Sequence, residues 1–346
     1  MNITILGQIK NRNTGLGKAL NDLIDAARGA SNIGQVNIVD ITNNFAFLLT
    51  LYRLLTVRTD VFYLTPAGSL FGNLRDSVIL WFIQLKNKPV IVHFHNSQYG
   101  RTLERYSWLL PINAYLYRNV SAIIILGDKQ RNMFAGMNVS ENKFIVIRNG
   151  IDEALFIDKF TLERKWSQEK LQVAYFSNMI PEKGYMRVLD VAKSLSHDKR
   201  FHFNFSGKFF DEDLKERFLK EIDSLDNATY FPGVYGEDKR KFLYSVHIFV
   251  LPSHYADETL PISMLEAASA GAYLLVSDVG VISEVVNMQV ATLLTEVNQD
   301  EIKGEILEVW EERKSLTFDI DYYRSFENQA IQEEILQVFE KVYRLR

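Results

Sequence analysis

Residues 251–271 read LPSHYADETLPISMLEAASAG and join the end of an expected strand to the start of an expected helix. The apolar run before this segment ends at Leu251, Glu258 follows in a loop, and Pro261 suits the first turn of a helix. That helix carries Glu266, a fixed carboxylate that can accept two hydrogen bonds from a vicinal diol such as a ribose. The amides of the helix N-terminus suit an anionic or sugar ligand. The alternative interpretation is a pair of solvated glutamates beside an ordinary helix.

A second strand–loop–helix segment covers residues 172–195. A strand over 172–176 leads into a loop, and Pro181 opens an expected amphipathic helix with Lys183 in its first turn. Because the helix dipole disfavours a cation there, this placement favours a lysine that faces a bound phosphate. Lys208 follows the next strand and is expected on the same rim. The alternative for Lys183 is a solvated surface side chain.

The first strand is followed by NRNTGLGKAL at residues 11–20. Gly15 and Gly17 permit close backbone approach just before an expected helix, which weakly indicates an anion-binding loop. The segment is neither a dinucleotide fingerprint nor a P-loop, because no glycine lies at the required distance before Gly17 and alanine follows Lys18. A plain structural turn is the alternative.

Two histidines, His93 and His95, end a buried strand in the segment VIVHFHN. Their spacing of two residues places them on the same side of the strand. With no third ligand evident and no cysteine in the chain, we expect no metal site. One histidine hydrogen-bonding a substrate hydroxyl, with the other packed beside it, is the simpler interpretation.

The whole chain alternates short β-rich runs with helical patterns, which predicts βαβ crossovers and two open parallel sheets. Strands are expected at 2–6, 36–41, 61–64, 89–95, 122–126, 144–147, 171–177, 201–207, 228–233, 247–253, 272–278 and 291–295, and early helices at 18–27, 44–55, 72–85 and 130–137. A helical tail from about residue 321 is expected to close the fold. We therefore expect an N-terminal Rossmann-like domain of residues 1–155 plus 322–346, and a C-terminal one of 156–321. Ligands of such sheets bind at the carboxyl ends of the strands.

Composition narrows the function classes. The 346 residues carry 39 Lys and Arg against 43 Asp and Glu, a net charge of −4 that argues against a dedicated nucleic-acid binder. The absence of cysteine excludes disulfides, thiol nucleophiles and iron–sulfur clusters. The first residues, MNITILGQ, have no basic region before their apolar stretch, so we expect no secretory signal, and no apolar stretch reaches about 18 residues. We therefore expect a cytoplasmic protein, with a peripheral position on the inner face of the membrane left open.

Taken in order, these segments resemble the retaining glycosyltransferases of the GT-B fold, specifically glycosyltransferase family 4. The resemblance is best over residues 172–286, and the first half matches more loosely through the glycine loop and the FHN and VIRNGID segments. The motifs that carry it are EKG at 182–184, SG at 206–207, VLPS at 250–253, the E-x7-E pair of Glu258 and Glu266, and DVGVISE at 278–284.

The resemblance implies a metal-independent, retaining transfer from a nucleotide-sugar donor such as a UDP- or GDP-sugar. The donor would lie in a cleft, mostly on the C-terminal domain, with the acceptor entering from the N-terminal domain. Glu266 would bind the ribose, Glu258 the donor sugar and Lys183 the diphosphate, while His95 would contact the transferred sugar. The candidate catalytic residues are thus His95 and Glu258, and the candidate donor-binding residues are Gly15, Gly17, Asn178, Lys183, Lys208, Glu258, Thr259, Leu260, Pro261, Ile262 and Glu266.

The sequence departs from the family pattern at three positions. Asn178 stands where the family commonly has arginine, so one cation for the diphosphate is missing. Pro261 replaces a frequent glycine and removes an amide donor, and Val281 replaces the second glycine of a pair. We hypothesise that Lys208 partly compensates for the missing arginine.

The net charge hides an asymmetry between the two halves. Residues 1–150 carry 16 basic and 8 acidic side chains, whereas residues 151–346 carry 23 and 35. The N-terminal half also holds the apolar segment 44–58 and the aromatic, basic segment 99–118. This combination suits an anionic membrane surface and a lipid-linked acceptor. A solvated basic face with normally packed helices is the alternative.

The expected activity is transfer of a sugar to a glycan or lipid-linked saccharide, in the synthesis of cell-surface polysaccharide or glycoconjugates. Two other functions stay open. A nucleotide-sugar epimerase of the same fold would turn over the donor without an acceptor. A non-catalytic subunit would bind the nucleotide sugar without turnover, which the asparagine at position 178 makes credible.

Overall fold

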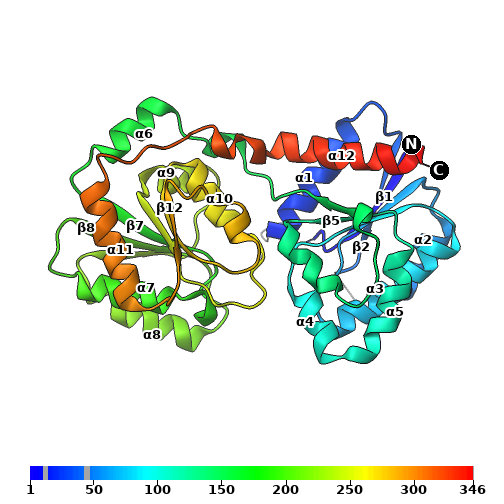
Figure 1. Ribbon diagram of the computed structural model, residues 1–346, viewed down its shortest axis with the longest axis horizontal. Helices are drawn as coiled ribbons and strands as arrows, with labels where there is room; N and C mark the ends of the chain where they lie inside the picture. Colours follow the sequence, from blue (N-terminus) through cyan, green and yellow to red (C-terminus); the bar gives the residue numbers. More distant parts are fainter. Residues whose placement is uncertain (11–14, 43–46, 346) are drawn as a thin grey trace. The chain divides into compact units, whose positions relative to one another are not determined.

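The computed structural model describes residues 1–10, 15–42 and 47–345, and the chain divides into two units within them. Unit 1 comprises Met1–Gly150 and Asn328–Arg346, and unit 2 comprises Ile151–Glu327. Each unit has its own six-stranded parallel sheet in the described residues (Figure 1). The predicted fold class, α/β with two Rossmann-like domains, is confirmed.

Unit 1 is built on a sheet with the strand order β2-β1-β3-β4-β5-β6, in which every neighbouring pair is parallel. Its strands are β1 (Asn2–Gly7), β2 (Gln35–Asp40), β3 (Val61–Leu64), β4 (Val90–His93), β5 (Ala122–Ile125) and β6 (Phe144–Val146). Each overlaps a strand expected from the sequence, because a strand buried on both faces is an uninterrupted apolar run.

The alternation of side chains along β3 shows how unit 1 forms a core on each face of its sheet. Val61 and Tyr63 point into one apolar cluster, which helices α1 (Gly15–Gly29) and α12 (Asn328–Arg344) cover. Phe62 and Leu64 point into the other cluster on the opposite face. The C-terminal helix α12 thus completes the N-terminal unit, as expected, and packs beside α1 (Figure 1).

The second face of the unit 1 sheet is covered by helices that lie between residues 47 and 134. These are α2 (Phe47–Thr56), α3 (Leu70–Leu85), α4 (Gln98–Arg105), the 3₁₀ turn η2 (Ser107–Leu109), α5 (Leu110–Arg118) and the 3₁₀ segment η3 (Asp128–Phe134). An α-helix was expected over 130–137, and that expectation is wrong in type. The expected helix 44–55 begins within residues 43–46, which lie outside the described residues.

Unit 2 repeats the architecture with the strand order β12-β11-β10-β7-β8-β9, again all parallel. Its strands are β7 (Leu171–Phe176), β8 (Phe201–Ser206), β9 (Ala228–Phe231), β10 (Ile248–Leu251), β11 (Tyr273–Ser277) and β12 (Ala291–Leu294). Its helices are α6 (Lys159–Trp166), α7 (Tyr185–Ser194), α8 (Glu212–Ile222), α9 (Gly236–Ser245), α10 (Ile262–Ser269) and α11 (Gln299–Glu312).

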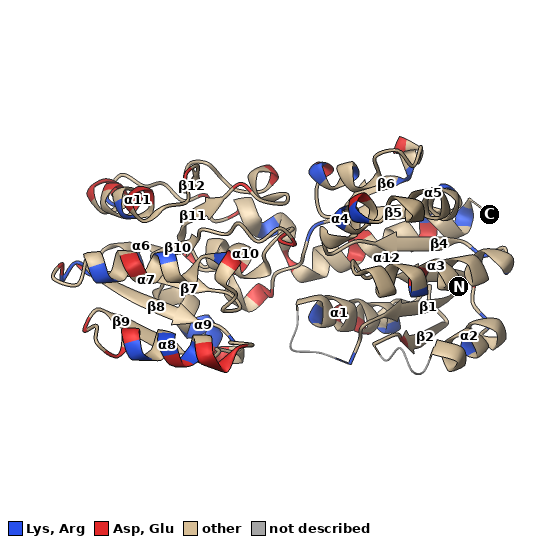
Figure 2. Cartoon of the chain, turned by 90° about the horizontal axis from the view of Figure 1, so that it is seen from below, with Lys and Arg blue, Asp and Glu red and all other residues tan. Residues whose placement is uncertain are grey.

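Charged residues lie mainly on helices and loops, and the strands of both sheets carry few of them (Figure 2). This distribution follows from the burial of parallel strands on both faces. No helix in the described part of the chain combines the length and apolar composition needed to cross a membrane.

Candidate active site

The candidate donor-binding residues of unit 2 lie at the carboxyl edge of its sheet. The loops after β7, β8, β10 and β11 all begin at this edge because these neighbouring strands are parallel. They carry Asn178, Lys208 and Glu258, and α10 begins there as well. The topology therefore brings together four segments that are far apart in the sequence.

Glycines allow these loops to approach each other closely. A Cβ on Gly207 would lie 1.8 Å from the carbonyl oxygen of Ser177, so the loops after β7 and β8 meet backbone to backbone. Gly280 has a φ of 59°, and a Cβ there would lie 2.2 Å from the carbonyl oxygen of Thr259. The amide of Val281 donates to that same oxygen at 2.9 Å. The loop after β11 thus holds the segment that follows Glu258.

Lys183 lies in a separate 3₁₀ turn, Pro181–Lys183, and not in the first turn of α7. Gly184 follows in the left-handed conformation with a φ of 85°, and α7 begins only at Tyr185. The sequence-based argument from an unfavourable helix dipole was therefore wrong at this residue. The turn is packed against the loop after β10, because a Cβ on Gly184 would lie 2.4 Å from the carbonyl oxygen of Pro252.

Lys183 and Glu258 form an ion pair at this edge. The Nζ of Lys183 lies 3.0 Å from Oε2 of Glu258, and their side chains are 11% and 8% exposed. The same Nζ donates to the Oγ of Ser177 at 3.2 Å and lies 5.6 Å from the centre of the Tyr255 ring. The cation is thereby fixed by groups from the loops after β7 and β10.

Glu266 is the fifth residue of α10, whose N-cap is Pro261, so the expected helix start is confirmed. Its side chain is 5% exposed and accepts a hydrogen bond from Nζ of Lys239 on α9 at 2.7 Å. An ion pair of this kind holds the carboxylate in one orientation. Of the other candidate residues here, Leu260 and Pro261 are buried and Ile262 is partly exposed.

Asn178 and Lys208 lie on the exposed rim of this edge. The carbonyl oxygen of Lys208 accepts from the amide of Met179 at 3.0 Å, which ties the two loops together. The ammonium of Lys208 lies 5.7 Å from the centre of the Phe210 ring. The backbone of Lys208 is thus fixed while its side chain remains accessible to a ligand.

In unit 1, His93 and His95 stack at the carboxyl end of β4, with ring centres 3.9 Å apart. The hydroxyl of Tyr63 lies 2.5 Å from Nδ1 of His93. Burial raises the pKa of Tyr63, so the hydroxyl is the donor and the Nδ1 of His93 accepts. Burial, together with the neighbouring imidazole, holds the pKa of His93 well below its ordinary value. His93 is therefore the packed, neutral member of the pair.

His95 is the more accessible histidine of the two. Its Nδ1 donates to the Oδ1 of Asn149 at 3.3 Å, which assigns the acceptor role to Nε2. Burial lowers the pKa of His95 to about 4, and the hydrogen bond to Asn149 opposes that shift. The side chain is thus a neutral acceptor for a donated hydroxyl proton near pH 7.

Gly15 and Gly17 belong to the first turn of α1 instead of preceding it, which corrects the expected start of that helix. The carbonyl oxygen of Gly17 accepts from Nδ2 of Asn21 at 2.7 Å. Residues 11–14, the rest of the expected glycine loop, lie outside the described residues. Among the residues that the structure describes, no group of three or more His, Asp or Glu side chains could hold a metal ion.

Sequence reasoning missed Lys239, Ser177 and Asn149, which are the partners of candidate residues. Lys239 sits in a run of charged residues on α9, and such a run normally indicates a solvated face. Asn149 is followed by Gly150, and an Asn-Gly pair normally indicates a turn. Nothing in the spacing of these residues points to their partners, because these contacts depend on how the loops and helices around each sheet pack.

Comparisons with known proteins agree with this architecture. The family profile described as glycosyl transferases group 1 matches residues 158–332. HepE of Anabaena, solved in complex with UDP, is 17% identical, with a TM-score of 0.75 over 99% of this chain and 100% of that one. Sucrose-phosphate synthase of Thermosynechococcus elongatus is 13% identical, with a TM-score of 0.73 over the full length of both chains. At these identities the structures show a shared fold. No curated protein sequence matches the chain.

Proposed function

We propose a specific reaction for this chain, which belongs to the family of glycosyl transferases group 1. It transfers a sugar from a nucleotide-sugar donor to a glycan or lipid-linked saccharide, with retention of the anomeric configuration, as expected for a member of glycosyltransferase family 4. The donor is a UDP- or GDP-sugar. Support for a uridine nucleotide comes from HepE, whose structures were determined with UDP and with UDP-glucose.

The single observation that carries the proposal is the Lys183–Glu258 ion pair at the carboxyl edge of the unit 2 sheet. Lys183 supplies a fixed positive charge for the diphosphate, which becomes the leaving group. Glu258 supplies an acceptor for hydroxyls of the donor sugar. Because Glu258 and Ser177 already hold the Lys183 ammonium, this part of the site is organised before the donor binds. The diphosphate of the donor would become a further partner of the ammonium.

Glu266 would accept hydrogen bonds from both hydroxyls of the ribose. Its pairing with Lys239 at 2.7 Å holds the carboxylate ready in one orientation. The segment 259–262 and the exposed side chains of Asn178 and Lys208 would complete the donor site. In unit 1, the free acceptor lone pair of neutral His95 would meet a hydroxyl of the transferred sugar, and the backbone at Gly15 and Gly17 would approach the phosphates or the acceptor.

In the reaction, the bond from the anomeric carbon to the diphosphate oxygen breaks, and a bond to the acceptor hydroxyl oxygen forms. The nucleoside diphosphate departs with the electron pair of the broken bond, and the proton of the acceptor hydroxyl passes to the departing diphosphate. The charges that develop on the leaving group are met by Lys183 and by Lys208. The chain's own cations thus stabilise the departing diphosphate, and we expect that no metal ion is needed for this.

A thermal-shift screen tests the donor assignment directly. Ligands that bind the native state raise the apparent melting temperature by mass action. We expect a rise with one class of nucleoside diphosphate and its sugar, unchanged by a chelator, and no rise with nicotinamide dinucleotides. No rise with any nucleotide sugar would contradict the proposal.

One observation favours a second candidate, a non-catalytic subunit that binds nucleotide sugars. Asn178 is exposed and uncharged where the family pattern has arginine, so the diphosphate would have one cation fewer. Such a subunit would show the same thermal shift, with no release of nucleoside diphosphate in the presence of an acceptor.

A further inference from the structure

Three neighbouring helical segments of unit 1 expose apolar side chains away from their own core. Helix α2 packs beside α3, and α3 packs beside α5. On α2 the exposed residues Leu48, Tyr52 and Leu55 follow the spacing i, i+4, i+7 of one helix face. We call the surface formed by these three segments the α2–α3–α5 face. Its exposed large apolar side chains include Leu48, Tyr52, Phe71, Trp81 and Tyr115, and Trp108 lies in the turn η2 that directly precedes α5.

The exposed apolar residues are additional to those that pack the helices onto the sheet. Helix α2 already buries Leu54, and α3 buries Ile79, Leu80 and Ile83 in the core. A surface helix normally turns polar residues outward, opposite its buried stripe. On α3, however, Phe71 and Trp81 are 75% and 49% exposed. These residues are not explained by the packing of unit 1.

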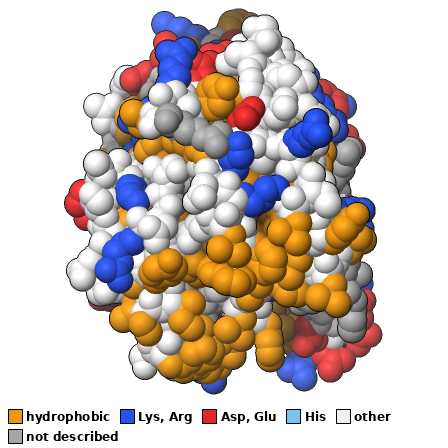
Figure 3. Space-filling model, turned by 90° about the vertical axis from the view of Figure 1, so that its right-hand side faces the viewer, with side chains coloured by type: hydrophobic (Ala, Val, Ile, Leu, Met, Phe, Trp, Pro, Cys, Tyr) orange, Lys and Arg blue, Asp and Glu red, His pale blue; other side chains and the backbone are white. Residues whose placement is uncertain are grey.

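Figure 3 views unit 1 from the side on which α2 lies. Hydrophobic side chains gather there in one broad area across the lower half of the view. Most of the Lys and Arg side chains in this view lie above that area. Contiguous apolar surface of this kind marks an interaction site in a soluble domain.

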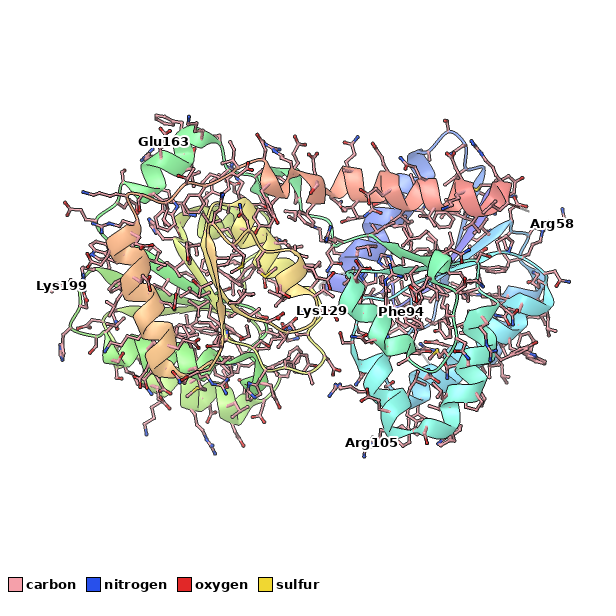
Figure 4. The ribbon with its side chains drawn as sticks, in the orientation of Figure 1. Arg58, Phe94, Arg105, Lys129, Glu163 and Lys199 are labelled. Carbon is pink, nitrogen blue, oxygen red and sulfur yellow. The ribbon has the colours of Figure 1, made fainter. Side chains whose placement is uncertain are left out.

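The charge around this surface is basic. Residues 47–118 contain eight Lys and Arg against three Asp and Glu. Arg53, Arg58, Arg105 and Arg118 are exposed, whereas Asp76 is buried and paired with Arg75. Figure 4 labels Arg58, just after α2, and Arg105, at the end of α4, and both point away from the body of unit 1.

We propose that the α2–α3–α5 face docks on an anionic phospholipid surface. Tryptophan and tyrosine favour the interface between lipid and water, and exposed leucine and phenylalanine side chains enter the acyl boundary. The arginines around the apolar area attract acidic headgroups. This inference goes beyond the transfer reaction and does not rest on it.

A second copy of the chain fits this surface less well. In a two-fold symmetric dimer the same patch meets itself, so the arginines of one copy would face those of the other. Anionic lipid instead supplies the complementary charge. The choice between lipid and a second copy therefore rests on the sign of the charge around the apolar area.

The test is flotation of the full-length chain with lipid vesicles, without donor or acceptor. We expect the chain to float with phosphatidylcholine vesicles that contain about 30% phosphatidylglycerol, and to float less with phosphatidylcholine alone or at high salt. The double variant Phe71→Ser/Trp81→Ser should lose at least about tenfold in partitioning, since a buried apolar group contributes strongly to interfacial binding. Arg53→Gln should lose about fivefold.

Matched variants in unit 2 are the controls. Phe160 is 75% exposed, as is Phe71, and Arg164 is exposed like Arg53. Phe160→Ser and Arg164→Gln should float like the wild type, and all variants should keep its melting temperature because the positions are exposed. The proposal is overturned if the wild type does not float with anionic vesicles, or if Phe160→Ser loses as much as the double variant. It is equally overturned if sedimentation shows a dimer that the double variant dissociates while vesicle binding is absent.

Discussion

The Nζ of Lys183 lies 3.0 Å from Oε2 of Glu258, and the two side chains are almost completely buried. These residues are 75 positions apart in the sequence and meet because β7 and β10 are neighbours in the sheet. Removing one partner of a buried ion pair leaves an uncompensated charge, which destabilises the fold. Replacing both partners by uncharged residues leaves no such charge. We therefore expect changes at this pair to alter both the stability of unit 2 and the diphosphate binding proposed for Lys183.

Lys183→Met should lower the free energy of unfolding by about 3 kcal/mol, because Glu258 would remain buried without its cation. The double variant Lys183→Met/Glu258→Gln should recover most of this stability but bind no nucleotide sugar. Urea denaturation and calorimetric titration measure the two effects separately. If the double variant bound donor like the wild type, Lys183 would not be the diphosphate ligand.

Glu266→Ala should weaken nucleotide binding roughly tenfold to a hundredfold, because two hydrogen bonds to a charged acceptor are lost. Glu258→Ala should mainly lower turnover. Glu163→Ala, at an exposed position on α6 labelled in Figure 4, is the control and should change neither quantity. Equal and negligible effects of the substitutions at 258 and 266 would refute the site assignment.

Lys239→Met should also weaken nucleotide binding, although Lys239 acts by orienting Glu266. Since the neighbouring carboxylate keeps its own hydrogen-bonding atoms, the loss should be smaller than that of Glu266→Ala, about tenfold or less. Calorimetry on both single variants and the double variant measures the coupling. Additive losses would show that the two residues act independently.

Lys208→Ala tests whether this lysine compensates for the arginine that is absent at position 178. We expect donor affinity to fall by about fivefold or more, since an exposed cation near a phosphate contributes about 1 kcal/mol. Lys199 lies just before the amino end of the same strand, β8, and Figure 4 labels it. Lys199→Ala is the control and should leave donor affinity unchanged. If Lys208→Ala also left donor affinity unchanged, Lys208 would not compensate for the absent arginine.

Buried histidines predict acid sensitivity of the fold. The Nδ1 of His247 accepts from the amide of Gln172 at 3.0 Å, its Nε2 contacts the carbonyl oxygen of Lys165, and burial lowers its pKa to about 4. The unfolded chain, with a pKa near 6.5, therefore binds more protons between these values. Stability should be full above about pH 6.5 and fall by up to ~1.4 kcal/mol per pH unit toward pH 4 for each such histidine.

Denaturation at pH 7, 6 and 5 measures that slope. His247→Asn should lower stability at neutral pH and reduce the slope, whereas His197→Asn, at an exposed position, should leave the slope unchanged. The same reasoning applies to His95, which stays neutral above about pH 4. If His247→Asn left the slope as steep as in the wild type, protonation of His247 would not be its source.

The fold was predictable because its strands are apolar runs buried on both faces. Segments such as AIII at 122–125 and IFVL at 248–251 are short, continuous apolar runs, which are typical of parallel strands buried on both faces. Periodicity was less informative where a segment is short, as at Asp128–Phe134, where a 3₁₀ segment replaces the expected helix. Local patterns do not distinguish these two geometries over two turns.

The site was predictable to the level of its loops but not of its contacts. The sequence placed Glu258 in a loop and Glu266 within the following helix, since Pro261 marks a helix start. It could not place Lys183 correctly, because Gly184 adopts a left-handed conformation that separates the lysine from α7. Nor could it pair Glu266 with Lys239, since that pairing depends on how α9 and α10 pack.

The most direct test of the central claim follows the anomeric proton of each nucleotide sugar in a panel by NMR, with full-length chain and a glycolipid extract as acceptor. We predict release of nucleoside diphosphate from one donor class, a new glycosidic signal with the donor's own anomeric configuration, and loss of both in Glu258→Ala. Binding without any release would identify a non-catalytic subunit. Conversion of the sugar while it is still attached to the nucleotide would identify an epimerase, and either result would contradict the proposed transfer.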